Sequence, residues 1–414
     1  MSGLFIYVGG EKVGVLEQDD QDSVTFRYDL SWLRGPKATP LSRKLPLQEE
    51  VFRGKQVRAF FAGLLPEQEP RAKIARILGI SEGNEFAMLE RIGGECAGAI
   101  TALPSHVEFS ENVTFPNDLR ELSEAELIDI IEELPRRPLM AGQSGVRLSL
   151  AGAQDKLPII VKGGKVSLPL GNTPSTHIIK PEPNRFPGLV ANEVFCMVLA
   201  ARVGINVPKV TVITPGQRPC ILIERYDRVI EGGKVQRLHQ EDFCQALGYP
   251  PERKYQEEGG PGLREVVKLI REWSSISVLD LRAFLESLIF NTYIGNADAH
   301  GKNYSFLYAG GEKRLAPFYD LVSTLAWPEI STNMAMKIGG CQQINHIESS
   351  HWQKMAKECN IGWPMLRDRL YYQAERIQAE LPRAVVTVKE MISTDVQNLC
   401  DIISKRTQKV LSAR

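Results

Sequence analysis

The apolar residues of this chain follow two different periods. In the first thirty residues, short runs rich in β-branched side chains, LFIYVGG, KVGVLEQ and SVTFRYDL, predict strands separated by turns. Farther along, REVVKLIREW, LDLRAFLESLIF and MLRDRLYYQAERI repeat at helical spacing and predict helices. The second of these carries one stripe at i, i+3, i+4, i+7 and i+8, formed by Leu281, Phe284, Leu285, Leu288 and Ile289. The pattern therefore predicts strands early in the chain and helices late.

These patterns divide the chain into three predicted parts. Residues 1–104 predict a small, mostly β accessory domain with one short helix in RAKIARILGI. Residues 105–228 predict a strand-rich lobe, with a helix over 123–134 that begins at the capping-box pattern of Ser123 and Glu126. Its predicted strands lie in GQSGVRLSLAGAQDKLPIIV, GKVSLPLG, THIIK, KVTVI and CILIERYDR, and an apolar helix, ANEVFCMVLAARVG, ends at Gly204. Residues 229–414 predict a helical lobe that begins with QEDFCQALG. The predicted fold class is α+β.

Composition excludes several classes of protein. The 414 residues hold 50 Lys and Arg against 50 Asp and Glu, so overall charge gives no argument for nucleic acid or a membrane. Seven scattered cysteines, without a CxxC motif, argue for reduced thiols and against a disulfide framework or a cysteine zinc site. The N-terminus lacks a basic region and predicts a strand rather than a signal peptide. No apolar run approaches the roughly 18 residues of a membrane span. We expect a cytoplasmic protein with no membrane partner.

The segment NADAHGKN places polar residues directly after an apolar helix. A strand-like YSFLY follows, and RLAPFYDLV then brings Asp320 to the end of a second short strand. A hairpin would set Asp298, Asn303 and Asp320 around one cleft, where one carboxylate acts as a base while an amide oxygen and a second carboxylate hold Mg²⁺. Phosphoryl transfer needs this division of roles. The alternatives are a chance D-x-x-x-x-N spacing and an ordinary turn or cap aspartate; a metal-hydrolase site is disfavoured because no second His stands at ligand spacing.

The strand-rich lobe supplies matching candidates. Residues 149–156, SLAGAQDK, form a loop of small residues whose backbone N–H groups could approach phosphates. Lys180 ends a predicted strand thirteen residues before Glu193, the arrangement of the kinase Lys–Glu pair. Backbone groups near Glu224 and Tyr226 could meet an adenine edge. Each feature alone is also explained by a β-turn, an exposed strand end, a first-turn helix charge or an edge strand. Their order along the chain favours a kinase.

In SLAGAQDK, STHIIK, ERYDR, LHQEDFCQALG, NADAHGKN and FYDLVST, the chain resembles the HipA family of bacterial toxin kinases over nearly its whole length. The resemblance implies a two-lobed, protein-kinase-like fold and a serine/threonine-protein kinase that uses ATP and Mg²⁺. It implies that Asp298 is the catalytic base, that Asn303 and Asp320 bind Mg²⁺ and that Lys180 binds phosphates. The chain has no HRD or DFG motif, since His300 follows the catalytic aspartate and Tyr319–Asp320–Leu321 stands where DFG would.

The resemblance also assigns the nucleotide contacts and a modification site. Ser149 matches a serine that family members autophosphorylate, which ejects the loop and inactivates the enzyme. A phosphate there adds about −1.5 to −2 charges at pH 7 beside the nucleotide's own anions, which is a physical reason for the loop to leave. The implied contacts are the phosphate loop, Ala151, Gly152, Ala153, Gln154, Asp155 and Lys156; the hinge, Glu224, Arg225 and Tyr226; and His300, Gly301, Lys302, Asn303, Tyr319 and Asp320, with Glu193 supporting Lys180.

The family implies partners as well. These are a small helix-turn-helix antitoxin, operator DNA bound through that complex, and a protein substrate, which in known members is an aminoacyl-tRNA synthetase. The basic end SKRTQKVLSAR, with Lys405, Arg406, Lys409 and Arg414, could touch DNA phosphates or could be the solvated face of a terminal helix. Two alternative functions stay open. A small-molecule phosphotransferase is disfavoured by the Ser149 loop, and a non-catalytic corepressor is disfavoured by the complete set of Lys180, Asp298, Asn303 and Asp320.

Overall fold

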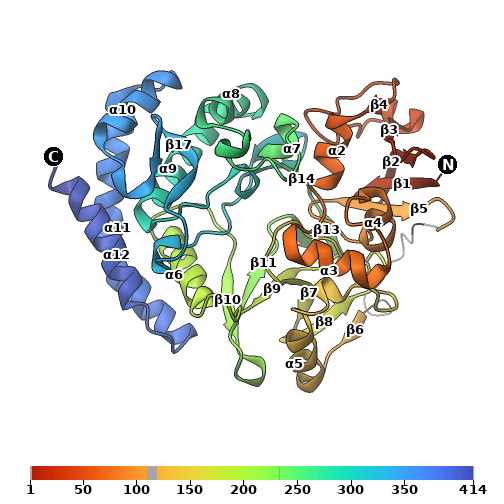
Figure 1. The fold of residues 1–414 in the computed structure, drawn as a ribbon, viewed down its shortest axis with the longest axis horizontal. Helices are drawn as coiled ribbons and strands as arrows, with labels where there is room; N and C mark the ends of the chain where they lie inside the picture. The colour runs from red at the N-terminus through yellow and green to blue at the C-terminus, as the bar shows by residue number, and fades with distance from the viewer. Residues whose placement is uncertain (1, 108, 110–118, 233, 414) are drawn as a thin grey trace.

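An antiparallel sheet and four helices form the N-terminal part of the molecule. The computed structural model describes residues 2–107, 109, 119–232 and 234–413 (Figure 1). The sheet has the order β4-β3-β2-β1-β5, with β1 (Ser2–Val8), β2 (Glu11–Gln18), β3 (Val24–Tyr28), β4 (Phe52–Arg53) and β5 (Ile100–Pro104). The helices are α1 (Leu30–Leu33), α2 (Lys55–Ala62), α3 (Gln68–Leu78) and α4 (Glu85–Ile92).

The N-terminal strands and α3 were predicted, but α2 and α4 were not. The apolar pair Phe60–Phe61 suits a strand as well as a helix, and α4 depends on a cap that the apolar pattern does not show. The Asn84 side chain accepts a hydrogen bond from the Ala87 N–H and begins α4. The N-terminal part is therefore more helical than the mostly β domain that the sequence predicts.

A second antiparallel sheet carries the strand-rich lobe. Its order is β10-β11-β9-β7-β8-β6, and its strands are β6 (Leu119–Glu121), β7 (Leu157–Lys162), β8 (Lys165–Pro169), β9 (His177–Pro181), β10 (Val210–Ile213) and β11 (Cys220–Glu224). Two helices join it, α5 (Glu124–Glu133), with the predicted capping box, and α6 (Leu189–Arg202). Residues 142–148 contain only an isolated bridge at Leu148, so the strand predicted there was wrong, whereas residues 149–156 form a loop as predicted. Their buried apolar residues, such as Leu148 and Leu150, belong to a packed loop.

Helices dominate the rest of the chain and pack around α9. They are α7 (Phe243–Leu247), α8 (Leu263–Trp273), α9 (Ser277–Ile294), α10 (Ser349–Glu358), α11 (Trp363–Met391) and α12 (Gln397–Leu411). Three small sheets are also present in this part. The first contains β12 (Arg228–Glu231) and β13 (Lys234–Arg237), and the second contains β14 (His239–Asp242), β15 (Ser305–Ala309) and β16 (Glu312–Leu315). The third contains β17 (Asn333–Ile338) and β18 (Cys341–Gln343). Short 3₁₀ turns are η1 (Pro138–Met140), η2 (Pro215–Gln217), η3 (Gln256–Glu258), η4 (Gly301–Asn303), η5 (Thr324–Ala326) and η6 (Ile344–His346).

Two details of this lobe differ from the predictions. Residues 240–242 belong to β14, so the helix predicted over QEDFCQALG covers only α7, which Asp242 and Gln245 begin with a capping box. The hairpin of β15 and β16 forms as predicted, but β16 ends at Leu315, five residues before Asp320. Asp320 therefore lies on a loop rather than at a strand end.

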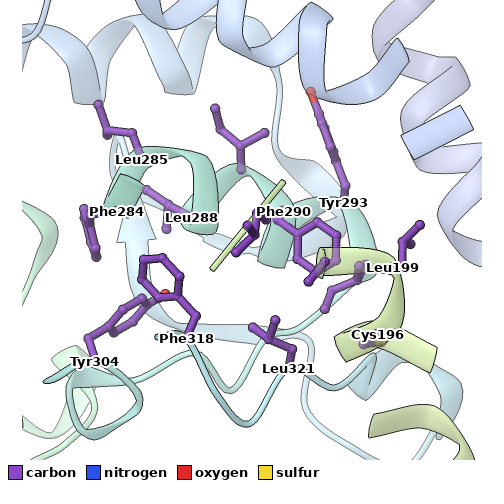
Figure 2. Packing of buried hydrophobic residues seen from close by; sticks show 14 of the residues in the cluster. Cys196, Leu199, Phe284, Leu285, Leu288, Phe290, Tyr293, Tyr304, Phe318 and Leu321 are labelled. Carbon is purple, nitrogen blue, oxygen red and sulfur yellow. The ribbon is translucent and has the colours of Figure 1, made fainter. Parts of the chain in front are cut away.

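Two hydrophobic cores hold these parts together. One core joins the N-terminal sheet to one face of the six-stranded sheet, since Leu4 and Phe60 belong to the same cluster as Leu157 and Ile179. The other fills the helical lobe and includes α6 (Figure 1). Figure 2 shows Leu199 and Cys196 of α6 on the side of Phe290 and Tyr293 of α9, with Tyr304, Phe318 and Leu321 below α9. The helix that carries Glu193 is thus anchored in the helical lobe. The three-part domain division stays a prediction.

The C-terminal helix α12 uses one of its basic residues inside the protein. The Arg406 guanidinium donates to the Thr292 and Ile344 carbonyl oxygens and to the Asn345 side chain, so it is not the free phosphate contact that the sequence suggested. Lys405 and Lys409 are exposed, and Arg414 lies outside the described residues. Across the described part of the chain, none of the helices combines the length and the apolar character that crossing a bilayer requires.

Candidate active site

The segment that follows α9 folds on its own polar side chains. Gly295 ends the helix with a left-handed φ of 76°, and its N–H returns to the carbonyl oxygens of the last turn. The Asn296 side chain then accepts from the Asp298 N–H at 3.0 Å, and the Asn303 side chain accepts from the His300 N–H at 3.3 Å. The polar residues of NADAHGKN therefore shape the loop, which we call the catalytic loop (residues 296–303), and hold Asp298 outward.

Lys180 joins the two lobes at the centre of the site. Its ammonium lies 2.8 Å from Glu193 Oε1 and 2.5 Å from Asp320 Oδ1. Burial opposes the charge on Lys180, but the two carboxylates outweigh burial and raise the pKa of the ammonium. Burial likewise opposes the charge on Asp320, yet Lys180 and then Lys156 lower its pKa to about 2. All three groups predicted for the Lys–Glu–Asp arrangement therefore meet, and Lys180 and Asp320 are charged.

Asp298 is exposed to solvent. Crowding by protein atoms reduces its hydration and raises its pKa, and the like charge of Asp320 adds to the effect. The Tyr255 hydroxyl opposes the shift, since it donates to Asp298 Oδ1 at 2.7 Å. Asp298 is thus a carboxylate with raised proton affinity, open to solvent, within electrostatic range of Asp320.

Asn303 and Asp320 provide the oxygen atoms expected for Mg²⁺. Asn303 Nδ2 lies 3.4 Å from Asp320 Oδ2, while Lys180 occupies the other oxygen of Asp320. Within the described residues, no group of three or more His, Cys, Asp or Glu could hold a metal ion. Mg²⁺ usually binds one or two protein ligands together with substrate phosphates and water. A carboxylate oxygen beside an Asn amide fits that coordination.

The phosphate loop (residues 149–156) is folded inward over the site. Ser149 is fully buried, and its hydroxyl donates to the Leu64 carbonyl at 2.8 Å. Gly152 has φ of 105°, a backbone conformation that residues with a side chain rarely adopt, so this turn favours glycine. The Lys156 ammonium donates to the Ala151 carbonyl at 2.7 Å. Burial and the nearby Lys180 lower the pKa of Lys156 to about 8. The loop thus brings a second cation to Asp320.

Two polar atoms near the loops are buried and have no hydrogen-bond partner within the described residues. They are Nε2 of Gln154 and Nδ1 of His300. Burial, and then the charge of Lys254, lower the pKa of His300 to about 3, so the imidazole is neutral. Buried polar atoms are nearly always paired, and a bound nucleotide would supply acceptors and donors here. Of the other loop residues, Ala153 is exposed, and burial raises the pKa of the half-exposed Asp155.

Of the three predicted hinge residues, Glu224, Arg225 and Tyr226, only Tyr226 has a side chain that contacts another predicted site residue. Tyr226 stacks on Tyr319, with ring centroids 5.7 Å apart, and the Tyr319 hydroxyl donates to the Lys302 carbonyl. Glu224 is exposed and pairs with Lys209 at 3.2 Å. The Arg225 side chain points into a buried ion cluster, where it contacts Glu95 at 3.0 Å and Asp227 at 2.7 Å. Tyr226 and Tyr319 therefore lie together, whereas the side chains of Glu224 and Arg225 do not join them.

Lys302 also points away from the Lys180–Asp320 centre. Its ammonium contacts Asp242 Oδ2 at 2.9 Å and the Gly63 carbonyl at 3.2 Å. The neighbouring Gly301 N–H donates to the Lys254 carbonyl at 3.4 Å. Within NADAHGKN, then, Asn303 contacts Asp320, while Lys302 anchors the loop on Asp242 and Gly63.

Three residues near the site were not predicted from the sequence: Glu67, Lys254 and Tyr255. Lys254 and Tyr255 lie in PERKYQEEGGPG, between α7 and α8. Tyr255 stands 43 residues from Asp298 and Glu67 stands 187 residues from Lys254, so no local spacing connects the partners.

The chain is similar to known protein families along most of its length. Residues 4–103 match the model of the HipA N-terminal domain, and residues 148–389 match that of the HipA-like C-terminal domain. A Sinorhizobium fredii protein named "Putative kinase Y4mE" is 41% identical over 411 residues, which is 98% of each chain. The serine/threonine-protein kinase toxin HipA of Shewanella oneidensis is 33% identical over 402 residues, 94% of this chain and 90% of that protein.

A solved structure of a HipA protein has a similar fold. The chain is similar to Shewanella oneidensis HipA in a complex with HipB and operator DNA, with a TM-score of 0.83 and 29% identity over 99% of this chain and 96% of that one. The predicted α+β, protein-kinase-like two-lobed fold is confirmed.

Proposed function

The chain belongs to the HipA family and is a kinase, and from this premise we propose that it is a toxin that transfers the γ-phosphate of ATP to a serine of a protein and so arrests growth. One observation carries the proposal. Lys180 bridges Glu193 in the helical lobe's core and Asp320 on the loop after β16, with Asn303 beside Asp320. Protein kinases need this ion pair and this aspartate in place to bind and orient the nucleotide.

Each residue then has a role that its position supports. Asp298 orients the acceptor hydroxyl and accepts its proton, for which its raised pKa is suited. Lys180, charged and fixed by two carboxylates, binds phosphate oxygens, and Lys156 in the phosphate loop adds a second cation. Asn303 and Asp320 would hold Mg²⁺, which neutralises charge on the phosphates when bound. The unpaired Gln154 and His300 atoms would pair with the nucleotide.

Ser149 fits the proposed self-inactivation because of where its hydroxyl lies. The residue is fully buried, with its hydroxyl on the Leu64 carbonyl, so it becomes an acceptor only when the phosphate loop opens. A phosphate of about −1.5 to −2 charges cannot return to this buried position against a carbonyl oxygen. Phosphorylation of Ser149 would therefore keep the loop out and remove Lys156 from the site.

The partners follow from the family. Because Shewanella HipA was solved with HipB and operator DNA, we propose that this chain binds a small helix-turn-helix antitoxin and, through it, operator DNA. Lys405 and Lys409 on α12 are exposed cations suited to phosphate contacts. The proposed substrate is an aminoacyl-tRNA synthetase. All seven cysteines are free thiols, which supports a reducing, cytoplasmic setting.

Intact-mass spectrometry with phosphosite mapping tests the function. The protein is incubated with Mg-ATP beside the Asp298→Asn variant and a control, Asp401→Asn, which changes an exposed aspartate on α12. We expect one added phosphate at Ser149 in the wild type and the control, and none in Asp298→Asn. Full modification of Asp298→Asn would refute the assigned base. Mg-ATP binding without phosphate transfer to itself or to a protein would instead indicate a corepressor, and turnover on a small alcohol alone would indicate a small-molecule phosphotransferase.

A further inference from the structure

A five-residue segment of the N-terminal part contacts both loops of the proposed active site. This segment, which we call the bridging segment (residues 63–67), connects α2 to α3 where the N-terminal part meets α7 and β14 (Figure 1). Gln68, directly after it, has φ of 50°, a left-handed conformation that is uncommon for a residue other than glycine. Such strain persists only where surrounding contacts impose it. The bridging segment has such contacts on two sides.

On one side the bridging segment holds the phosphate loop. The Leu64 carbonyl accepts the Ser149 hydroxyl at 2.8 Å. The Glu67 N–H donates to the Gly152 carbonyl at 3.2 Å, and Pro66 and Gly152 form a parallel β-bridge. The inward position of the phosphate loop thus depends on backbone groups of the bridging segment.

On the other side it holds the catalytic loop. Glu67 is the N-cap residue of α3, but its side chain does not cap that helix. Its carboxylate turns instead to Lys254, at 2.8 Å, and to Lys302, at 3.6 Å. The Gly63 carbonyl adds a second contact to the Lys302 ammonium at 3.2 Å. Lys254 in turn precedes Tyr255, whose hydroxyl donates to Asp298.

The charges in this cluster balance only when Glu67 is present. Two cations, Lys254 and Lys302, face two carboxylates, Glu67 and Asp242, and all four side chains are buried. Burial opposes ionisation of Glu67, but Lys302 and Lys254 outweigh it and lower its pKa to about 2. Without Glu67, Lys254 loses its carboxylate partner in a buried site, and a buried ion without a partner is strongly unfavourable. Lys254 would move toward solvent and take Tyr255 with it.

We infer that Glu67 is a positioning residue of the kinase, and that the bridging segment couples the phosphate loop to the catalytic loop. The inference rests on the proposed function for its effect on activity. It also extends the proposed self-inactivation. When Ser149 is phosphorylated and the phosphate loop leaves, Leu64 and Glu67 lose their partners in that loop, and the anchor of Lys254 and Lys302 loosens. Inactivation then disorders the catalytic loop as well as removing the phosphate loop.

Amide hydrogen exchange of the full chain, read by mass spectrometry, tests the coupling without requiring activity. In Glu67→Gln we expect exchange to become about tenfold faster in both residues 149–156 and residues 296–303. The matched control is Asp280→Asn, which removes another buried carboxylate, paired with Arg314 at 2.9 Å on α9 and β16. The control should accelerate exchange near β16 and leave both loops protected. Unchanged exchange in either loop of Glu67→Gln would overturn the coupling.

A second pair of variants tests the direction of the effect. Ser149→Asp, which introduces charge where the hydroxyl meets Leu64, should also accelerate exchange in residues 296–303, and adding Glu67→Gln should cause no further acceleration. Additive effects would show that the two loops respond independently and would overturn the inference. If Glu67→Gln does not fold, Lys254→Gln breaks the same ion pair from the other side, with the same expected result.

Activity separates this inference from the proposed function. We expect Glu67→Gln to lower the rate of Mg-ATP-dependent phosphorylation at least about tenfold, mainly through kcat, because Glu67 contacts the loops rather than the nucleotide. If the wild type is active and Glu67→Gln is equally active, the inference about Glu67 is overturned while the proposed function stands. A wild type that phosphorylates nothing would overturn the proposed function, and the exchange data would still decide whether the bridging segment couples the loops.

Discussion

The hydrogen bond from Tyr255 to Asp298 leads to a prediction about the pH dependence of the kinase. The Tyr255 hydroxyl lies 2.7 Å from Asp298 Oδ1, and if Asp298 is the proposed base, the hydroxyl of a protein acceptor would donate to the same carboxylate. In the free enzyme this bond stabilises the ionised carboxylate and lowers its pKa against the raising effect of burial. Tyr255→Phe removes the donor and leaves the ring, which packs edge-on against His300 with centroids 5.3 Å apart.

The magnitude follows from the energy of the bond. A hydrogen bond to a charged group contributes about 1.5–3 kcal/mol, and the lower end applies because solvent reaches Asp298. Since 1.36 kcal/mol corresponds to one pH unit, the acid limb of kcat/KM should move up by about one pH unit in Tyr255→Phe. The kcat profile reports the complex, in which the acceptor has displaced Tyr255, so its acid limb should stay in place.

The assay is the initial rate of phosphorylation of a protein acceptor between pH 5 and 8, measured for the wild type and Tyr255→Phe. Tyr249→Phe is the matched control, because Tyr249 donates to Glu265 at 2.9 Å, a carboxylate to which we assign no role in the site. An acid limb of kcat/KM that does not move in Tyr255→Phe would refute the role given to the bond. Equal movement in kcat would show that Tyr255 stays on Asp298 while the acceptor is bound.

Two further predictions concern charge. Lys180→Met should lower the phosphorylation rate at least about a hundredfold, because Glu193 and Asp320 lose the cation that fixes them; a rate within threefold of the wild type would contradict this. Glu241 is buried, and burial raises its pKa to about 7. The folded protein therefore binds a proton at this carboxylate more readily than the unfolded chain does. The free energy of unfolding consequently falls as pH rises from about 4.5 through 7. Urea unfolding at pH 5 and 8 should show a loss of roughly 3 kcal/mol in the wild type that Glu241→Gln lacks.

Local patterns predicted the elements that local interactions determine. The capping box of Ser123 and Glu126 begins α5 as expected, and the apolar stripe of α9 faces the core of the helical lobe. Residues 142–148 were predicted to contain a strand, whereas in the structure they form a loop whose apolar residues Val146 and Leu148 are buried. Pattern alone does not distinguish these cases, since a packed loop buries apolar side chains as a strand does.

Some residues of the candidate site were predicted from motifs, and others were not. Motifs with fixed spacing identified Lys180, Glu193, Asn303 and Asp320, and the structure brings them into contact. The side chain of Arg225 was expected near the nucleotide but serves a buried ion cluster. The sequence does not show this because Glu95, its partner, lies 130 residues away. This contact is set by the tertiary fold, and nothing in the residues around Arg225 indicates it.

The backbone of Asp320 explains why the two lobes must be correctly placed for this site to form. Asp320 has φ of 53°, a conformation that costs a residue other than glycine about 1–3 kcal/mol. Its carboxylate is fixed by Lys180, which β9 holds opposite Ile221 of β11 in the six-stranded sheet. Lys180 is fixed in turn by Glu193, whose helix is part of the core of the helical lobe. A shift of the sheet relative to that lobe would separate Lys180 from a carboxylate and release the strain at Asp320. The position of the aspartate proposed to bind Mg²⁺ therefore depends on the packing between the lobes, and one ammonium group makes the connection.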